Sequence, residues 1–181
     1  PRHGLLQRLR ASGNGVLLGA ASFREGVAVA GGAPSVLVID TPDAVIINQN
    51  DSKPRPGQLR QLRASLDEIA PSKRRVLLSS YSPASIVNSF VRDAQRVSMK
   101  EKAEYVRYVA GNCRLLGVHD FMPFASQVIY KRRDSAWAND FKVTYDDLVA
   151  HWDGSARLLP PFTRLDLKNG SYTSVPPDQY R

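Results

Sequence analysis

The sequence predicts an α/β fold with a mixed β-sheet and helices packed on its outer face. Three observations support this: strand-like runs fill the first third, amphipathic helices then alternate with short apolar strands, and Gly and Pro residues separate these segments. Strands followed by a strand–helix–strand–helix–strand order are typical of a layered α/β sandwich rather than a doubly wound sheet. A chain of 181 residues can also bury a hydrophobic core of its own.

Short aliphatic and β-branched runs predict strands at 16–18, 27–30, 35–40 and 44–48. The last two flank Thr41, Pro42 and Asp43, which predicts a hairpin. The strand at 44–48 is apolar at nearly every position, as a strand covered on both faces would be.

Helical periodicity begins after this strand. A first helix is predicted over 58–70, where Pro71 ends it, and residues 74–79 then predict a buried strand. A second helix is expected to open with a Ser-x-x-Glu capping box at Ser98 and Glu101 and to end at Gly117. Its apolar face is formed by Met99, Ala103, Val106, Ala110 and Cys113. A strand at 119–125, a helix at 144–152 and weak strands at 157–159 and 163–167 complete the order.

Composition excludes several classes of protein. No apolar run approaches membrane-spanning length, no signal-peptide pattern opens the chain, and the single Cys113 excludes an internal disulfide, so a cytoplasmic protein is expected. The polar opening, with Pro1 in place of Met, indicates a segment of a longer protein. The net charge of +8 fits a nucleic-acid partner, an acidic protein partner or simply a solvated basic surface, and charge alone does not decide among them. Nucleic acid is the less favoured of these, because the basic clusters at 73–75 and 131–133 are not interleaved with stacking aromatics.

The strongest local signal is residues 44–54, AVIINQNDSKP. A buried strand ends there in a polar cluster centred on Asp51, before a helix begins, and ligand sites of α/β proteins collect at such strand ends. Aspartate is a hard oxygen ligand suited to Fe, Mn or Zn. The alternative is a turn in which Asn50 and Asp51 cap backbone amides, and the residue pattern alone favours that turn.

This segment resembles the fourth metal-binding motif of the metallo-β-lactamase fold, in the subgroup with CMP-sialic-acid hydroxylases and ascorbate-phosphate-type lactonases. The resemblance continues through the Ser-rich run at 79–85, the helix opening at 99–102 and the run Met122-Pro123-Phe124-Ala125. It spans roughly residues 35–131 and implies an αββα sandwich. On this basis we expect residues 1–167 to form the C-terminal part of a catalytic domain and residues 168–181 a polar tail.

Two departures from the family pattern concern histidine. The His-x-His-x-Asp-His signature is absent, because His3, His119 and His151 are isolated in the sequence. The late metal-binding histidine of many members is replaced by residues 123–125, and His119 is better explained as a core or surface residue.

One branch of the fold accounts for both departures: the di-iron β-hydroxylases of nonribosomal peptide pathways, of the chloramphenicol pathway β-hydroxylase type. There a glutamate upstream of the bridging aspartate replaces one ligand and no late histidine is needed. Glu25 stands at a comparable distance before Asp51, although an exposed turn carboxylate beside Arg24 is the alternative. The resemblance implies that Asp51 bridges two Fe ions, that Glu25 binds one, and that a preceding N-terminal segment carries the His-x-His-x-Asp-His motif.

The implied function is an O₂-dependent, non-haem di-iron monooxygenase of antibiotic biosynthesis that hydroxylates an aminoacyl group tethered to a peptidyl carrier protein. Its partner would be an acidic carrier protein with a phosphopantetheine-bound amino acid, which would give the basic surface a purpose. The alternatives are a metal-dependent hydrolase, with Zn in place of Fe, or a sugar-nucleotide hydroxylase of the same fold. A non-catalytic basic scaffold that binds an acidic partner or nucleic acid also remains open.

Overall fold

The computed structural model describes residues 36–49, 54–83, 91–92, 95–96, 101–126 and 128–174. The strands predicted at 16–18 and 27–30, the candidate ligands Glu25 and Asp51, and residues 175–181 lie outside this part of the chain.

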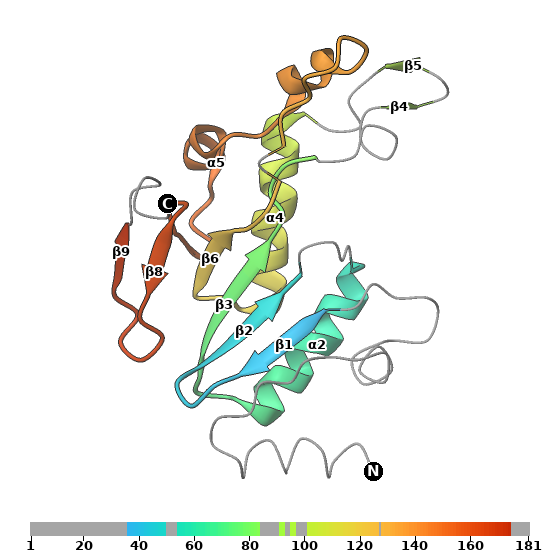
Figure 1. Cartoon of the computed structure of the whole chain (residues 1–181). Coiled ribbons are helices and arrows are strands. Elements are labelled where there is room, and N and C mark those ends of the chain that lie inside the picture. Colours follow the sequence, from blue (N-terminus) through green and yellow to red (C-terminus); the bar gives the residue numbers. More distant parts are fainter. Residues whose placement is uncertain are drawn as a thin grey trace.

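The described residues form a five-stranded mixed sheet with the order β1-β2-β3-β6-β7 (Figure 1). β1 runs antiparallel to β2, and each of the other neighbouring pairs is parallel. The strands are β1 (Leu37–Asp40), β2 (Ala44–Asn48), β3 (Arg74–Ser79), β6 (Asp120–Pro123) and β7 (Arg157–Leu158). The four parallel strands therefore have their carboxyl ends at one edge of the sheet and their amino ends at the other.

The β1–β2 hairpin confirms the prediction made from Thr41, Pro42 and Asp43. The Thr41 hydroxyl donates to the Ala44 carbonyl at 2.7 Å and accepts from the Ala44 amide at 3.0 Å, so the side chain closes the turn. Ile39 then pairs with Ile46, which fixes the register of the hairpin.

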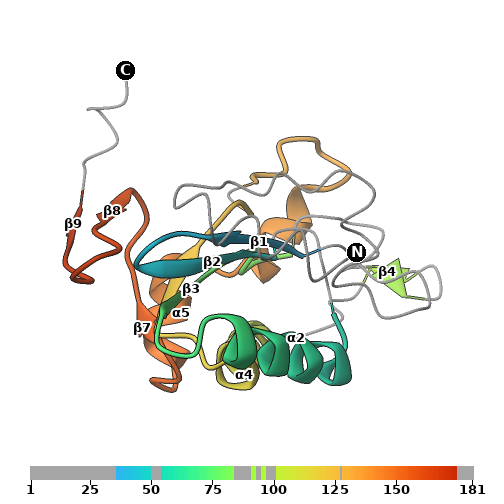
Figure 2. The same ribbon diagram turned by 90° about the horizontal axis from the view of Figure 1, so that it is seen from below.

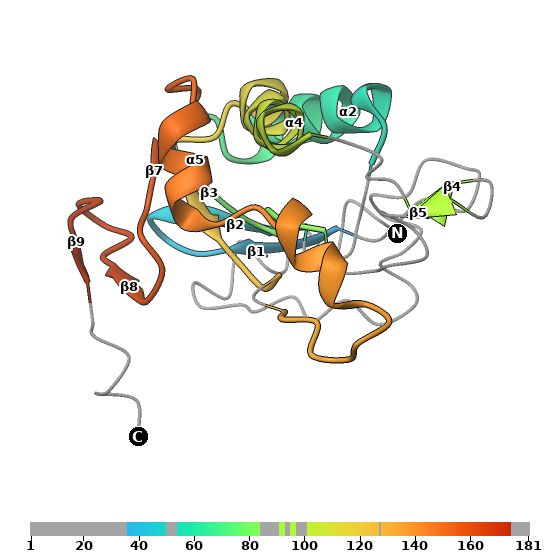
Figure 3. The same cartoon turned by 90° about the horizontal axis from the view of Figure 1, so that it is seen from above.

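Two helices, α2 (Pro56–Ile69) and α4 (Lys102–Leu116), cover the same face of the sheet (Figures 2 and 3). The leucine stripe predicted for the first helix is confirmed, because Leu59, Leu62 and Leu66 are buried. Proline in the first turn of α2 suits its start, since those amides have no partner within the helix. The predicted apolar face of α4 is confirmed for Val106, Ala110 and Cys113, which are buried, whereas Ala103 is of intermediate exposure and Met99 lies outside the described residues. α4 ends at Gly117, which adopts φ 62°.

The capping box predicted at Ser98 and Glu101 is wrong. α4 begins at Lys102, and Glu101 itself is the N-cap, with an extended backbone at φ −64° and ψ 152° and no side-chain cap hydrogen bond. A helix capped by Ser98 would have required helical geometry at Glu101. The acidic Glu104 in the first turn faces the positive end of the helix dipole instead.

The hydrophobic core lies between the sheet and these two helices. Register places Ile47 of β2, Leu77 of β3 and Phe121 of β6 in one row, and all three are fully buried. Trp152 stacks on Phe121 with 5.1 Å between ring centroids and donates its indole N–H to the Ala156 carbonyl at 2.7 Å. Cys113 is fully buried in the same core, as its helix position predicted.

The opposite face of the sheet is apolar but only partly covered. Of the alternate residues that point to this side, Ala44, Val76 and Asp120 are buried, whereas the others named here are of intermediate exposure: Leu37, Ile39, Ile46, Leu78 and Met122. Residues 128–141 lie on this side of the sheet, away from α2 and α4 (Figures 2 and 3).

The remaining elements are short. They are β4 (Val91–Arg92), β5 (Gln95–Arg96), η2 (Ala136–Phe141), α5 (Tyr145–His151), β8 (Thr163–Leu165) and β9 (Tyr172–Ser174). The helix predicted at 144–152 is confirmed as α5, whose N-cap Thr144 forms a capping box with Asp147. The polar tail expected from Lys168 includes β9, which pairs antiparallel with β8.

These elements confirm an α/β fold with a mixed sheet and with two helices, α2 and α4, on one of its faces. Within the described ranges, no helix combines the length and the apolar character needed to cross a membrane.

Candidate functional site

The candidate site is the carboxyl edge of β2, β3 and β6, where the chain leaves three neighbouring parallel strands (Figure 1). Backbone hydrogen bonds extend the sheet beyond the strands: the Gln49 amide donates to the Leu78 carbonyl at 2.8 Å, and the Phe124 amide donates to the Ser79 carbonyl at 3.0 Å. We define the carboxyl edge as Gln49, residues 79–83 and residues 123–126.

Gln49 follows directly on β2 and is the first polar side chain of this edge. It is only 1% exposed, and its amide oxygen Oε1 has no hydrogen-bond partner. A buried amide oxygen without a hydrogen bond is unfavourable by about 1–3 kcal/mol, so such atoms are rare in native proteins, and a ligand, an ordered water or an ion is the usual explanation. Gln49 also stands two residues before Asp51 in the sequence.

Lys142 lies between η2 and α5 and connects two loops of this edge. Its Nζ donates to the Pro83 carbonyl after β3 and, at 2.9 Å, to the Ser126 carbonyl after β6. The neighbouring Val143 amide donates to the Ser82 hydroxyl at 2.9 Å. The segment at 142–143 therefore fixes the loops that follow β3 and β6 relative to each other.

Lys142 is a buried cation, 9% exposed, and no carboxylate of the described residues forms an ion pair with it. Burial lowers the pKa of Lys142 from 10.5 to about 8, because the ammonium loses solvation that two carbonyls only partly replace. The group is thus still mainly protonated at neutral pH and places positive charge within the carboxyl edge.

The loop after β6 is strained at this edge. Ala125 and Ser126 have φ values of 56° and 68°, in the left-handed region that residues other than glycine rarely adopt. The Ser126 hydroxyl is also buried without a hydrogen-bond partner. Strain of about 1–3 kcal/mol per residue persists only where the surrounding structure holds it, and such positions concentrate at functional sites.

Tyr105 of α4 approaches the same edge from the helix layer. Burial raises the pKa of its phenol, with a smaller contribution from Tyr108, while a side-chain hydrogen bond with Ser80 acts in the opposite direction. The phenol consequently stays protonated and serves as a neutral hydrogen-bonding group beside the loop after β3.

The two predicted metal ligands, Asp51 and Glu25, both lie outside the described residues. In the part of the chain that the structure describes, no group of three or more His, Cys, Asp or Glu side chains could hold a metal ion. The described residues of the carboxyl edge contribute amide, hydroxyl and amine groups, so carboxylate or imidazole ligands would have to come from other segments.

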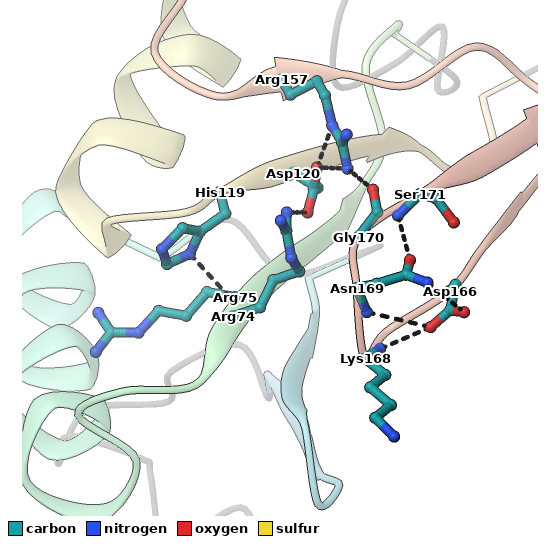
Figure 4. A network of polar contacts seen from close by, with 10 residues as sticks. All are labelled: Arg74, Arg75, His119, Asp120, Arg157, Asp166, Lys168, Asn169, Gly170 and Ser171. Carbon is teal, nitrogen blue, oxygen red and sulfur yellow. Dashed lines mark hydrogen bonds and ion pairs between the residues drawn. The ribbon is translucent and has the colours of Figure 1, made fainter.

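A second polar cluster, which the sequence analysis did not anticipate, occupies the amino ends of β3, β6 and β7 (Figure 4). Asp120 is fully buried; its two carboxylate oxygens pair with Arg74 at 2.5 Å and with Arg157 at 2.6 Å. Arg157 also donates to the Gly170 carbonyl at 2.6 Å and lies over the Tyr172 ring. Both oxygens of this carboxylate are therefore occupied, and we call this cluster the amino edge.

His119 belongs to the amino edge rather than to the candidate site. Its Nδ1 accepts from the Arg75 amide at 3.0 Å, which fixes the other nitrogen as the protonated one in the neutral ring (Figure 4). Burial, followed by the nearby Arg74, lowers the pKa of His119. The residue as a whole is exposed, in agreement with the sequence prediction of a core or surface histidine.

Arg75, 3% exposed, completes this edge. It donates to the Leu116 carbonyl at 3.0 Å and pairs with Asp67 of α2, although its Nε has no partner. Its role is to connect β3 to the carboxyl ends of both helices.

Protein-family models, curated proteins and solved structures were each compared with this chain, and none of them matches it. The class that the fold defines is an α/β protein with a mixed sheet, and two of its buried polar side-chain atoms without hydrogen bonds, Gln49 Oε1 and Ser126 Oγ, lie where the parallel strands end.

Proposed function

We propose that this chain is the C-terminal half of a metallo-β-lactamase-fold, metal-dependent oxygenase whose active site lies at the carboxyl edge. In this proposal Asp51 bridges two Fe ions and Glu25 binds one of them. The remaining ligands come from an upstream His-x-His-x-Asp-His segment. The observation that carries the proposal is the buried, unsatisfied Gln49 Oε1, located where β2 leads toward Asp51.

The partly covered apolar face of the sheet supports the choice of fold. Side chains such as Ile46, Leu78 and Met122 are left partly open on the side away from α2 and α4. A sandwich of two sheets buries such a face against the second sheet, about 10 Å away. The proposal assigns that second sheet to the N-terminal half of the enzyme.

The reaction proposed is β-hydroxylation of an aminoacyl group held on a carrier protein. Two iron ions would supply the activation of O₂, which no side chain can provide alone. The described residues would bind and orient the substrate: Gln49 Oε1 can accept a hydrogen bond from an amide N–H, and Lys142 keeps the loops after β3 and β6 in place.

Metal analysis of the protein expressed together with its upstream sequence tests the proposal. We expect about two irons per chain, as a two-metal site requires. Asp51→Ala should lose the metal, and Glu25→Gln should lower occupancy. Asp43→Ala is the matched control, because Asp43 is an exposed turn carboxylate of the same sequence region. Its metal content should equal that of the native protein.

The outcomes separate the competing functions. If the native protein holds stoichiometric zinc and Asp51→Ala loses it, the proposed function changes from oxygenase to metal-dependent hydrolase. If Asp51→Ala loses iron and the native protein turns over a free sugar nucleotide, the sugar-nucleotide hydroxylase would be favoured. Full metal occupancy in Asp51→Ala, or an upstream sequence without the histidine motif, would refute the metal site and leave the non-catalytic scaffold.

A further inference from the structure

The loop that follows the carboxyl edge exposes aliphatic side chains. Val128 is 42% and Ile129 is 71% exposed, and Phe124 just before them is 40% exposed. Single exposed apolar residues are common, whereas neighbouring ones next to a candidate site indicate an interaction surface. These residues lie on the side of the sheet that α2 and α4 leave open (Figure 3).

The same loop is basic immediately after its apolar part. Lys131, Arg132 and Arg133 are all exposed. Arg132 pairs with Asp134 at 2.9 Å, whereas no carboxylate among the described residues forms an ion pair with Lys131 or Arg133. Two positive charges next to Ile129 are therefore free to meet negative charges on another molecule.

The backbone of this loop is held in place by specific hydrogen bonds. The side-chain amide of Asn139 accepts from the Tyr130 N–H and donates to the Tyr130 carbonyl, both at 2.9 Å, in the way a neighbouring strand would. The Arg132 carbonyl accepts from the amides of Ser135 at 3.0 Å and Ala136 at 2.8 Å. A backbone fixed in this way loses little conformational entropy when a partner binds.

The base of the loop is connected to the candidate site. Ser126, which precedes it, accepts from Lys142 at 2.9 Å at the carboxyl edge. A molecule bound to residues 128–133 would consequently lie beside the ends of β3 and β6, from which a tethered group can reach the edge.

We infer that residues 128–133 form a docking surface for an acidic protein that presents an apolar side chain among carboxylates. Val128 and Ile129 supply the apolar contact, and Lys131 and Arg133 supply the charge. This inference rests on the proposed function, because it assigns the surface to the carrier protein that would deliver the substrate. A protein fits better than nucleic acid, since the most exposed apolar side chains of the loop, Val128 and Ile129, are aliphatic and cannot stack on bases, while Tyr130 beside Lys131 is only partly exposed.

The test measures binding of a fluorescently labelled acidic peptidyl carrier protein, in its phosphopantetheinylated form, to the intact protein. The charge reversal Lys131→Glu with Arg133→Glu should weaken binding by about tenfold or more and flatten its salt dependence. Ile129→Ser should weaken binding by about fivefold with an unchanged salt dependence. Lys168→Glu is the matched control, since Lys168 is an exposed lysine on the turn between β8 and β9 (Figure 4), and it should change binding less than about twofold.

Three results would overturn the inference: no binding of the carrier protein, equal weakening by the reversal and by Lys168→Glu, or tighter binding of a single-stranded oligonucleotide that displaces the carrier. Metal content is measured on the same samples. Reversal-sensitive carrier binding by a protein without metal would refute the proposed function and keep the docking surface. If instead the protein holds metal but binds the carrier protein equally well after the charge reversal, the docking surface would be refuted and the proposed function kept.

Discussion

Buried polar groups have different partners at the two edges of the parallel strands. At the amino edge the fully buried Asp120 has both oxygens paired, with Arg74 and Arg157. At the carboxyl edge Gln49 Oε1 and Ser126 Oγ are buried without partners, and Lys142 has only carbonyls around its charge. Arg75 Nε and, two residues before β7, Ser155 Oγ show that the amino ends of the strands also hold unsatisfied atoms. The clear difference lies in the buried charges: the carboxylate of the amino edge is paired with two guanidinium groups, whereas the ammonium of Lys142 is hydrogen-bonded to carbonyls.

The largest change in the free energy of unfolding is expected for a substitution in the amino edge. Asp120→Ala should lower the free energy of unfolding by about 3 kcal/mol, because two guanidinium groups lose their shared carboxylate. The value lies at the low end for buried pairs since both arginines are partly exposed. Chemical denaturation measures it. Asp134→Ala, which removes an exposed partner of Arg132, is the control and should change little. A small effect of Asp120→Ala would mean that the cluster contributes no stability.

A smaller loss of stability is expected for a substitution at the carboxyl edge. Lys142→Met should lower the free energy of unfolding by about 1 kcal/mol, because the carbonyls of Pro83 and Ser126 lose their donor. Removal of a buried charge offsets part of this loss. Denaturation at pH 7 measures the net effect, and a marked stabilisation would show that desolvation of the ammonium outweighs its two hydrogen bonds.

The pH dependence isolates the charge on Lys142. Its pKa is lowered to about 8 in the folded protein, against 10.5 ordinarily, so between these values the unfolded state binds more protons. The native protein should therefore gain stability relative to Lys142→Met as the pH rises from about 8 to 10.5. Denaturation curves of both proteins across this range give the difference directly. A constant difference would place the Lys142 pKa at its ordinary value.

The smallest effect, and the opposite sign, is expected for Gln49. Gln49→Met keeps the side-chain volume and removes an amide oxygen that has no partner, so stability should stay constant or rise by up to about 1 kcal/mol. Under the proposed function the same variant should lose substrate turnover. Strong destabilisation of Gln49→Met would instead make Gln49 part of the architecture, as Asp120 is.

Elements with a local signal could be predicted from the sequence. The leucine spacing of α2, the turn at Thr41 and the apolar run of β3 each depend on residues close together in the chain, and the structure has all three. The start of α4 was misplaced because a Ser-x-x-Glu pattern is only a local preference, which the extended backbone at Glu101 overrides.

The polar clusters depend on contacts between distant residues, which periodicity cannot detect. Arg74 and Asp120 are 46 positions apart, and Lys142 and Pro83 are 59 apart. Nothing near Lys142 in the sequence distinguishes it from a surface lysine. Gln49 was included only as a neighbour of Asp51, and the roles predicted for Asp51 and Glu25 stay predictions.

Gly170 links the C-terminal strands to the centre of the sheet. Its carbonyl accepts from Arg157, its φ is +72°, and a Cβ there would come within 2.3 Å of the Arg74 guanidinium. The residue is thus required both for the turn and for the approach of two arginines to Asp120. Truncation before this glycine would uncover the buried carboxylate and its guanidinium partners, so a stable shortened protein must keep the β8–β9 hairpin.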